Sequence, residues 1–132
     1  MTAHAGTPRR LESYVCGGWA PGAGEGKPLL NAATGEPVAF IDSSGIDFAE
    51  MLAFGREKAG ASLRAMSFHE RALMLKAIGL MLMEKKEEFY AESLATGATR
   101  ADGWVDIEGG IVTLMNYASK GRRELPNTKV LV

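Results

Sequence analysis

The sequence predicts an α/β chain in which a small antiparallel β-meander is followed by three or four helices. Residues 11–41 contain short runs of strand-forming side chains separated by glycine-rich turns. From Ser43 onward, the apolar residues recur at the spacing of an α-helix. The longest helical pattern covers residues 67–97 and opens with a capping box. We therefore expect a β part over residues 11–45 and a helical part over residues 46–132.

Composition argues against several classes of partner. The chain has 132 residues, 46% of them hydrophobic, and a formal net charge of -1. This balance argues against nucleic acid or an anionic membrane as the main partner. No apolar run is long enough to cross a membrane, and no secretory signal is visible. The single cysteine suits a cytoplasmic protein. Residues 1–10 are expected to form a flexible tail.

The β part is predicted from turn residues and strand propensity. Residues 11–19 predict a strand, a turn at Gly17 and Gly18, and the start of a returning strand. Residues 21–28 form a glycine-rich loop, after which residues 29–30 resume a strand. A turn over residues 31–35 leads to a strand over residues 38–41. So few strands are marginally stable without a covering layer.

The first and third helical patterns are bounded by glycines. Ser44 and Asp47 give the start signal of the first helix, and Gly60 is expected to end it before a link over residues 61–66. The third pattern covers residues 104–120, with Gly121 as its expected end. Residues 129–132 look like the start of a strand.

The second pattern, over residues 67–97, is the most apolar segment of the chain. Ser67 and Glu70 form its capping box, and Gly97 is expected to end it. The polar run at residues 84–88 shifts the apolar phase, so a kink or break is expected there. The side of this helix that is clearly suited to face solvent is narrow and consists of His69, Ala72, Lys76, Gly79 and Met83. A helix that is apolar over most of its circumference needs neighbours on several sides.

This broad apolar surface leaves two interpretations open. Together with a strand beginning at residue 129, it favours a fragment of a larger protein. Alternatively, the helices pack on the β-meander, and the C-terminal residues are frayed.

Chemically interesting residues are few. Cys16 is the only thiol, and the sequence places neither His4 nor His69 beside it, so we interpret it as structural. Gly22, Gly24 and Gly26 are followed by a strand rather than by a helix, which favours a hairpin loop over a phosphate cradle. No metal-ligand pattern is present.

Three carboxylates and three basic residues have ordinary explanations at this stage. The carboxylates of Asp102, Asp106 and Glu108 are interpreted as charges that complement a helix start. The basic cluster is interpreted as a solvated helix end and consists of Lys120, Arg122 and Arg123.

Gly109 and Gly110 are the anomaly of the third helical pattern. Two glycines inside a helix cost about 1 kcal/mol each relative to alanine. Such positions mark the close approach of another backbone or of a ligand. Tight helix packing and a bound substrate both remain open.

Several stretches resemble the N-terminal portion of the aldehyde dehydrogenase superfamily. They are VCGGW at residues 15–19, NAATGEPVA at 31–39, Glu70 with Arg71, and Thr96 with Gly97. Here Ala32 replaces the usual proline and Ala98 the usual lysine. Residues 63–67, 69–76, 95–110 and 123–126 are similar to the branch of bifunctional phenylacetate-degradation proteins, which join a semialdehyde dehydrogenase to an oxepin-CoA hydratase.

The resemblance implies a function for the intact protein. It would be an NADP- or NAD-dependent oxidoreductase that oxidises a CoA-linked semialdehyde of the 3-oxo-5,6-dehydrosuberyl type in phenylacetate catabolism. Its nucleophilic cysteine, general-base glutamate, oxyanion asparagine and cofactor-binding segments would lie beyond residue 132. The fragment would therefore contain no catalytic residue, bind no cofactor alone and be inactive. Alternatives are a semialdehyde dehydrogenase of benzoyl-CoA degradation and a non-enzymatic helical binding module.

The resemblance also implies structural roles. Residues 11–45 would be associated with the oligomerisation domain of a homo-oligomer, and residues 46–132 would form a truncated helical part of the nucleotide-binding domain. One helix would line the tunnel for the acyl-CoA semialdehyde, through Asp106, Gly109, Gly110 and Tyr117. Related enzymes carry a larger side chain near Gly109, so the glycine pair would widen the passage.

Overall fold

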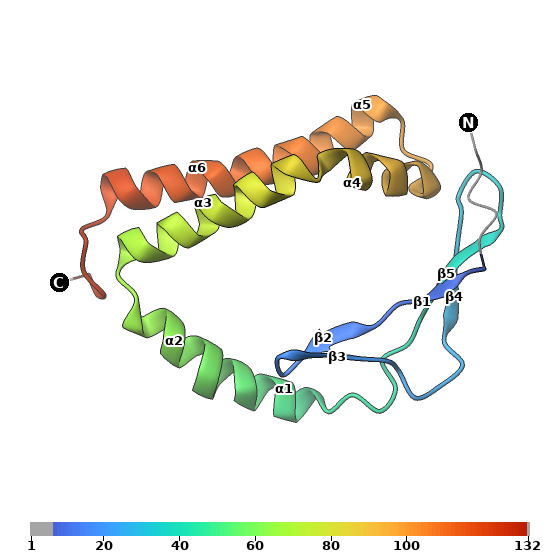
Figure 1. Ribbon diagram of the computed structural model, residues 1–132, viewed down its shortest axis with the longest axis horizontal. Coiled ribbons are helices and arrows are strands. Elements are labelled where there is room, and N and C mark those ends of the chain that lie inside the picture. Colours follow the sequence, from blue (N-terminus) through green and yellow to red (C-terminus); the bar gives the residue numbers. More distant parts are fainter. Residues whose placement is uncertain (1–6, 132) are drawn as a thin grey trace. The chain divides into compact units, whose positions relative to one another are not determined.

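The computed structural model describes residues 7–131, and these divide into two compact units (Figure 1). The first unit runs to Gly55 and includes Ala95–Gly97. The second comprises Arg56–Leu94 and the described residues from Ala98 onward. The two units are considered separately below.

The first unit contains two small sheets rather than one meander. The three-stranded sheet has the order β1-β5-β4, where β1 (Arg9–Arg10) is parallel and β4 (Lys27–Leu30) antiparallel to β5 (Pro37–Ile41). A separate antiparallel hairpin joins β2 (Ser13–Val15) to β3 (Gly18–Ala20). Local turn signals predicted strands in the regions of β2 to β5, but the division into two sheets depends on pairings between distant residues.

The flexible tail predicted for residues 1–10 is wrong for Arg9 and Arg10, which form β1. The guanidinium of Arg10 donates hydrogen bonds to the carbonyl oxygens of Gly22 (3.0 Å) and Glu25 (3.2 Å) and pairs with Asp42 at 3.2 Å. These partners are far away in the sequence, so composition alone gave no sign of them. Residues 1–6, which include His4, lie outside the described residues.

The first helical stretch is longer than predicted. α1 (Phe48–Phe54), the π-helix η1 (Gly55–Ala59) and α2 (Gly60–Ala65) follow one another directly, so Gly60 does not end the helix and residues 61–65 are not a link. Asp47, rather than Ser44, is the N-cap, and its carboxylate accepts from the N–H groups of Ala49 (2.9 Å) and Glu50 (3.0 Å).

The predictions for residues 67–97 are confirmed at both ends and at the break. α3 (Phe68–Glu84) begins with the Ser67–Glu70 capping box. Lys85 leaves helical geometry (φ −95°, ψ 5°), and α4 (Lys86–Ser93) and the 3₁₀-helix η2 (Leu94–Thr96) follow. Gly97 has a φ of +82°, a left-handed conformation in which glycine is favoured.

The last helix starts earlier and ends later than predicted. α5 (Arg100–Gly103) has its own capping box between Thr99 and Asp102, and the π-helix η3 (Trp104–Glu108) leads into α6 (Gly109–Glu124). Gly121 does not end the helix. A β-carbon at Gly121 would lie only 3.2 Å from that of Ala72, so this glycine permits a close helix crossing.

The strand predicted at residues 129–132 is wrong for residues 129–131, and Val132 lies outside the described residues. The segment after α6 instead returns to the start of α3. The N–H of Phe68 donates to the carbonyl of Thr128 (2.9 Å), and the hydroxyl of Ser67 donates to Asn127 Oδ1 (2.7 Å). These bonds fasten the segment after α6 to the start of α3, at one end of the α3–α6 pair.

α3 and α6 pack side by side in opposite directions (Figure 1). Ala72 and Gly79 of α3, with Ile111 and Ala118 of α6, are buried. The arc of α3 predicted to face water therefore contributes to the buried contact, which is a correction. In the described residues, the apolar arc is exposed through Leu73, Met74, Ile78, Leu80 and Met81.

Candidate substrate-binding face of helix α6

α6 has two chemically different sides. The side towards α3 carries buried Ile111 and Ala118 with half-buried Leu114 and Met115. The other side carries Gly109, Thr113 and Tyr117 at successive intervals of four residues, which places them in line along the helix. Tyr117 is 67% exposed. A ligand lying on this side would meet polar and glycine positions.

The four residues assigned to a substrate tunnel lie on one stretch of helix. Asp106 is in η3, Gly109 and Gly110 open α6, and Tyr117 lies two turns further on. From Asp106 to Tyr117 this stretch spans about 16 Å at an α-helical rise. The geometry brings the four residues along one path, but nothing in the described residues shows a closed tunnel.

Gly109 and Gly110 face open space. A β-carbon at either position would meet nothing within 4 Å. In contrast, a β-carbon at Gly79 would lie 2.7 Å from Met115 Sδ, and one at Gly103 would lie 3.2 Å from Ser93 Oγ. Within the described part of the chain, tight packing explains Gly79 and Gly103 but does not explain the pair at Gly109 and Gly110.

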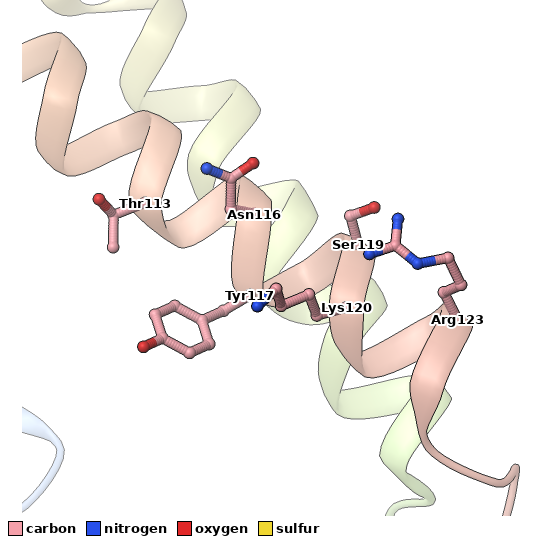
Figure 2. Close-up of a pocket in the computed structure, with 6 residues that line it drawn as sticks. All are labelled: Thr113, Asn116, Tyr117, Ser119, Lys120 and Arg123. Carbon is pink, nitrogen blue, oxygen red and sulfur yellow. The ribbon is translucent and has the colours of Figure 1, made fainter.

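An open surface hollow of about 430 Å³ lies along the same helix, and Figure 2 shows its six lining side chains, all of which are exposed. All its lining residues come from α6: Thr113, Asn116, Tyr117, Ser119, Lys120 and Arg123. The sequence interpretation treated Lys120 and Arg123 as part of a solvated helix end. Their spacing from Asn116, four and seven residues, was the signal that could have placed them on a common face.

The charge of this hollow is positive. Its lining contains two cations and no carboxylate. Arg123 donates to Glu124 at 3.0 Å, and both side chains are exposed. Lys120 makes no ion pair within residues 7–131. Such a surface suits an anionic group on a ligand.

A second polar cluster fixes the start of α6. The hydroxyl of buried Tyr90 donates to Glu108 Oε1 (2.9 Å), and Lys86 Nζ lies 3.2 Å from the same oxygen. The Arg100 guanidinium lies 4.3 Å from the centre of the Tyr90 ring. Glu108, the last residue of η3, therefore connects η3 to α4 through Tyr90 and Lys86. It also directly precedes the start of α6.

Hydrogen bonding explains the charge states of this cluster. The bond from Tyr90, followed by that from Lys86, holds the pKa of Glu108 below its ordinary value. Burial, followed by the bond to Glu108, raises the pKa of Tyr90 above its ordinary value. The folded state thus favours a neutral tyrosine beside a charged carboxylate.

The glycine-rich loop is organised around a carboxylate. Gly24 N–H donates to Asp42 Oδ2, and Ala23 N–H donates to the carbonyl of Ser44 (2.9 Å). Bonds from Ser44, with a further one from Gly24, lower the pKa of Asp42. A loop that already binds a carboxylate does not suit phosphate, so the described residues do not form a dinucleotide site there.

The remaining candidates carry no recognisable catalytic arrangement. Cys16 lies in the turn between β2 and β3, with a φ of +51°, and not within a strand as predicted. His69 Nε2 is 2.8 Å from the carbonyl oxygen of Leu125. Across residues 7–131, no three potential ligands gather to hold a metal ion. No helix among these residues is long and apolar enough to cross a membrane.

Comparison with known proteins shows a similarity to a curated enzyme. No family model matches the chain. The chain is 42% identical over 114 residues to the 3,4-dehydroadipyl-CoA semialdehyde dehydrogenase of Aromatoleum evansii. The match covers 86% of this chain but 22% of the relative, so the chain spans about a fifth of that enzyme's length. The similarity agrees with a CoA-semialdehyde dehydrogenase fragment, while the phenylacetate assignment stays a prediction.

Proposed function

We propose that this chain is the N-terminal part of an aldehyde dehydrogenase that oxidises a semialdehyde carried on coenzyme A. The similarity to the Aromatoleum evansii enzyme carries this proposal. The intact enzyme would use NADP or NAD. The catalytic groups and the cofactor site would belong to other parts of that enzyme, so the 132-residue chain alone would be inactive.

The exposed face of α3 supports a role as part of a larger protein. Leu73, Leu80 and Met81 are each 48% exposed, although they lie near the middle of a 17-residue helix. Several large apolar side chains exposed on one helix are typical of an interaction site. We propose that further parts of the dehydrogenase cover it, and that the β part joins the oligomerisation domain of a homo-oligomer.

The substrate we propose first is the one in the relative's name, a dehydroadipyl-CoA semialdehyde. The longer dehydrosuberyl-type semialdehyde of phenylacetate catabolism is the second candidate. It is favoured by the resemblance of residues 95–110 to the phenylacetate branch. Both substrates carry the aldehyde and the coenzyme A at opposite ends, so both need an extended passage.

A chimeric enzyme tests the proposal without assuming what adjoins this chain. This chain would replace the matching 114-residue segment of the Aromatoleum evansii enzyme. We expect the purified chimera to reduce NADP or NAD in the presence of dehydroadipyl-CoA semialdehyde, whereas the 132-residue chain alone should not. A higher kcat/KM with the dehydrosuberyl substrate would favour the phenylacetate candidate.

A folded chimera without activity on either substrate would contradict the proposal. Circular dichroism and the oligomeric state of the parent enzyme provide the folding control. In that case, a 132-residue chain that is monomeric and melts cooperatively would favour the helical binding module.

Gly109 offers a sharper test of the substrate passage. In the chimera, Gly109→Leu should raise KM for the CoA-linked semialdehyde much more than for a small aldehyde, because the new side chain enters space that is open in this structure. Ala101→Leu is the matched control, since it adds the same side chain to an exposed position on α5. Equal effects of Gly109→Leu on both substrates would exclude a role in the passage.

A further inference from the structure

We propose that the hollow beside α6 binds the phosphates of the substrate's coenzyme A through Lys120 and Arg123. The pantetheine arm would then run along α6 towards Gly109 and Gly110. This inference rests on the proposed function, because the relative's substrate name supplies the coenzyme A. It adds a recognition site to a helix end that the sequence interpretation left to solvent.

The cations are the first argument. Coenzyme A carries a diphosphate and a 3′-phosphate on one nucleotide. Lys120 and Arg123 are separated by one helical turn and line the same hollow. Arg123 also pairs with Glu124, but a guanidinium has five donors and can bind a phosphate at the same time.

The neutral side chains of the hollow are also suited to this ligand. Asn116 and Ser119 can donate hydrogen bonds to phosphate oxygens. Tyr117 presents an exposed aromatic ring between Lys120 and the glycine pair, where the pantetheine arm would pass over it. The Thr113 hydroxyl donates to the carbonyl of Gly109 (2.9 Å), so its oxygen can still accept from an amide of the arm.

The span along the helix is the third argument. Gly110 and Lys120 are ten residues apart, which is about 15 Å at an α-helical rise. This is comparable with an extended pantetheine arm. A ligand whose phosphates lie at Lys120 therefore has its thioester near the glycine pair, where a β-carbon would meet nothing within 4 Å. The distance between the cations and the open glycine pair therefore matches the distance between the phosphates and the thioester of the ligand.

The test uses the chimera and two substrates that differ only in the carrier. One is the CoA thioester of the semialdehyde, and the other is its N-acetylcysteamine thioester, which keeps the thioester end but has no phosphate. Removing both cations with Lys120→Ala and Arg123→Ala should raise the ratio of the two KM values at least tenfold. The dependence of KM on salt for the CoA thioester should weaken as well.

Matched variants separate recognition from general charge. Arg122→Ala removes a charge from the same helical turn, but Arg122 does not line the hollow, so this variant should not change the KM ratio. Lys120→Arg keeps the charge and should restore most of the affinity lost in Lys120→Ala. An unchanged KM ratio in the double variant would overturn the inference while the proposed function stands.

Two further outcomes are informative. A rise in KM for NADP alone would assign the cations to the cofactor's phosphate and overturn the inference. Calorimetric titration of CoA into the chimera does not depend on turnover. If a folded chimera is inactive but its CoA affinity falls tenfold in the double variant, the phosphate site stands without the proposed reaction. Equal CoA affinity of the double variant and its parent would refute the site.

Discussion

Five glycines of the second unit fall into two groups according to what a β-carbon would meet. Gly79, Gly103 and Gly121 each face a neighbouring side chain at 2.7–3.2 Å. Gly109 and Gly110 face open space. Because all five lie in helical segments, the same residue type marks close packing in one group and a free surface in the other.

Substitutions in the two groups should change stability in opposite directions. Gly110→Ala should raise the free energy of unfolding by about 1 kcal/mol, since alanine is the better helix former and meets no obstacle. Gly79→Leu should lower it by about 1–3 kcal/mol, because the side chain would displace Met115 from the α3–α6 contact. Urea unfolding followed by circular dichroism measures both. A destabilising Gly110→Ala would show that this face is already packed in the folded chain.

The Tyr90–Glu108 bond should make stability depend on pH at both extremes. The pKa of Glu108 lies below its ordinary value of 4.5, so its contribution is present above that pH and is lost as pH falls through the lowered pKa. The pKa of Tyr90 lies above its ordinary value of 10.0, so its contribution is present below that pH and is lost as pH rises through the raised pKa.

Tyr90→Phe tests this dependence because it removes the hydroxyl and leaves the ring. We expect a lower urea midpoint at neutral pH, a smaller loss of stability on acidification and no alkaline loss from this residue. Tyr117→Phe is the control, since Tyr117 is 67% exposed. Part of the acid dependence should remain in Tyr90→Phe, because hydrogen bonds also lower the pKa values of Asp42, Glu70 and Asp102. Identical pH profiles for Tyr90→Phe and the parent would contradict the assignment.

At the scale of elements, boundaries set by local chemistry were predictable. The capping box at Ser67, the break after Glu84 and the left-handed Gly97 all depend on residues within one or two turns. Gly60 and Gly121 misled the prediction, since both lie within continuous helical stretches. A glycine does not signal a helix end where packing requires a small residue. At Gly121, the requirement came from Ala72, which is distant in the sequence.

The buried side of α3 could not be chosen from hydrophobicity. Ala72 and Gly79 are small, and their size lets the backbone of α6 approach closely. A count of apolar residues favours the wider arc of Leu73, Ile78 and Leu80, which is the exposed one. The pattern showed that α3 has apolar surface to bury, but not which side meets α6.

The start of α3 should be sensitive to a single hydroxyl. Ser67→Ala removes the acceptor for the Glu70 N–H (3.2 Å) and the donor to Asn127 (2.7 Å). We expect a loss of about 1 kcal/mol in the free energy of unfolding, measured by urea titration. Ser67→Asp retains a capping acceptor and should recover part of this loss. No change in Ser67→Ala would mean that the cap is replaced by water at no cost.

At the scale of the whole molecule, the roles of the candidate site residues stay predictions. Resemblance singled out Asp106, Gly109, Gly110 and Tyr117, and the structure places them along one helix. Lys120 and Arg123 are exposed near the end of α6, as a solvated helix end requires, and their proposed role in binding depends on the hollow that they share with Tyr117. Spacing alone could not distinguish a binding face from a solvated helix end.

The exposed apolar arc of α3 links the fold to the proposed function. Its side chains would be buried in an intact dehydrogenase, but they contact water in the chain described here. Such a surface promotes self-association of the isolated chain. The same residues should therefore lower the solubility of the isolated chain and contribute to the assembly of the intact dehydrogenase.

Substituting this arc should have opposite effects in the chain and in the chimera. In the 132-residue chain, Leu73→Glu with Leu80→Glu should reduce self-association and preserve helix content, because both side chains are 48% exposed. In the chimera, the same pair should impair assembly and lower activity, since charges would enter a buried contact. Light scattering and circular dichroism test the first effect, and gel filtration with kcat/KM tests the second.

Ile111→Glu is the control, because this residue is buried against α3 and its replacement should disrupt both proteins. A fully active, normally assembled Leu73→Glu, Leu80→Glu chimera would show that the arc faces solvent in the enzyme as well, and would remove this support for the fragment proposal.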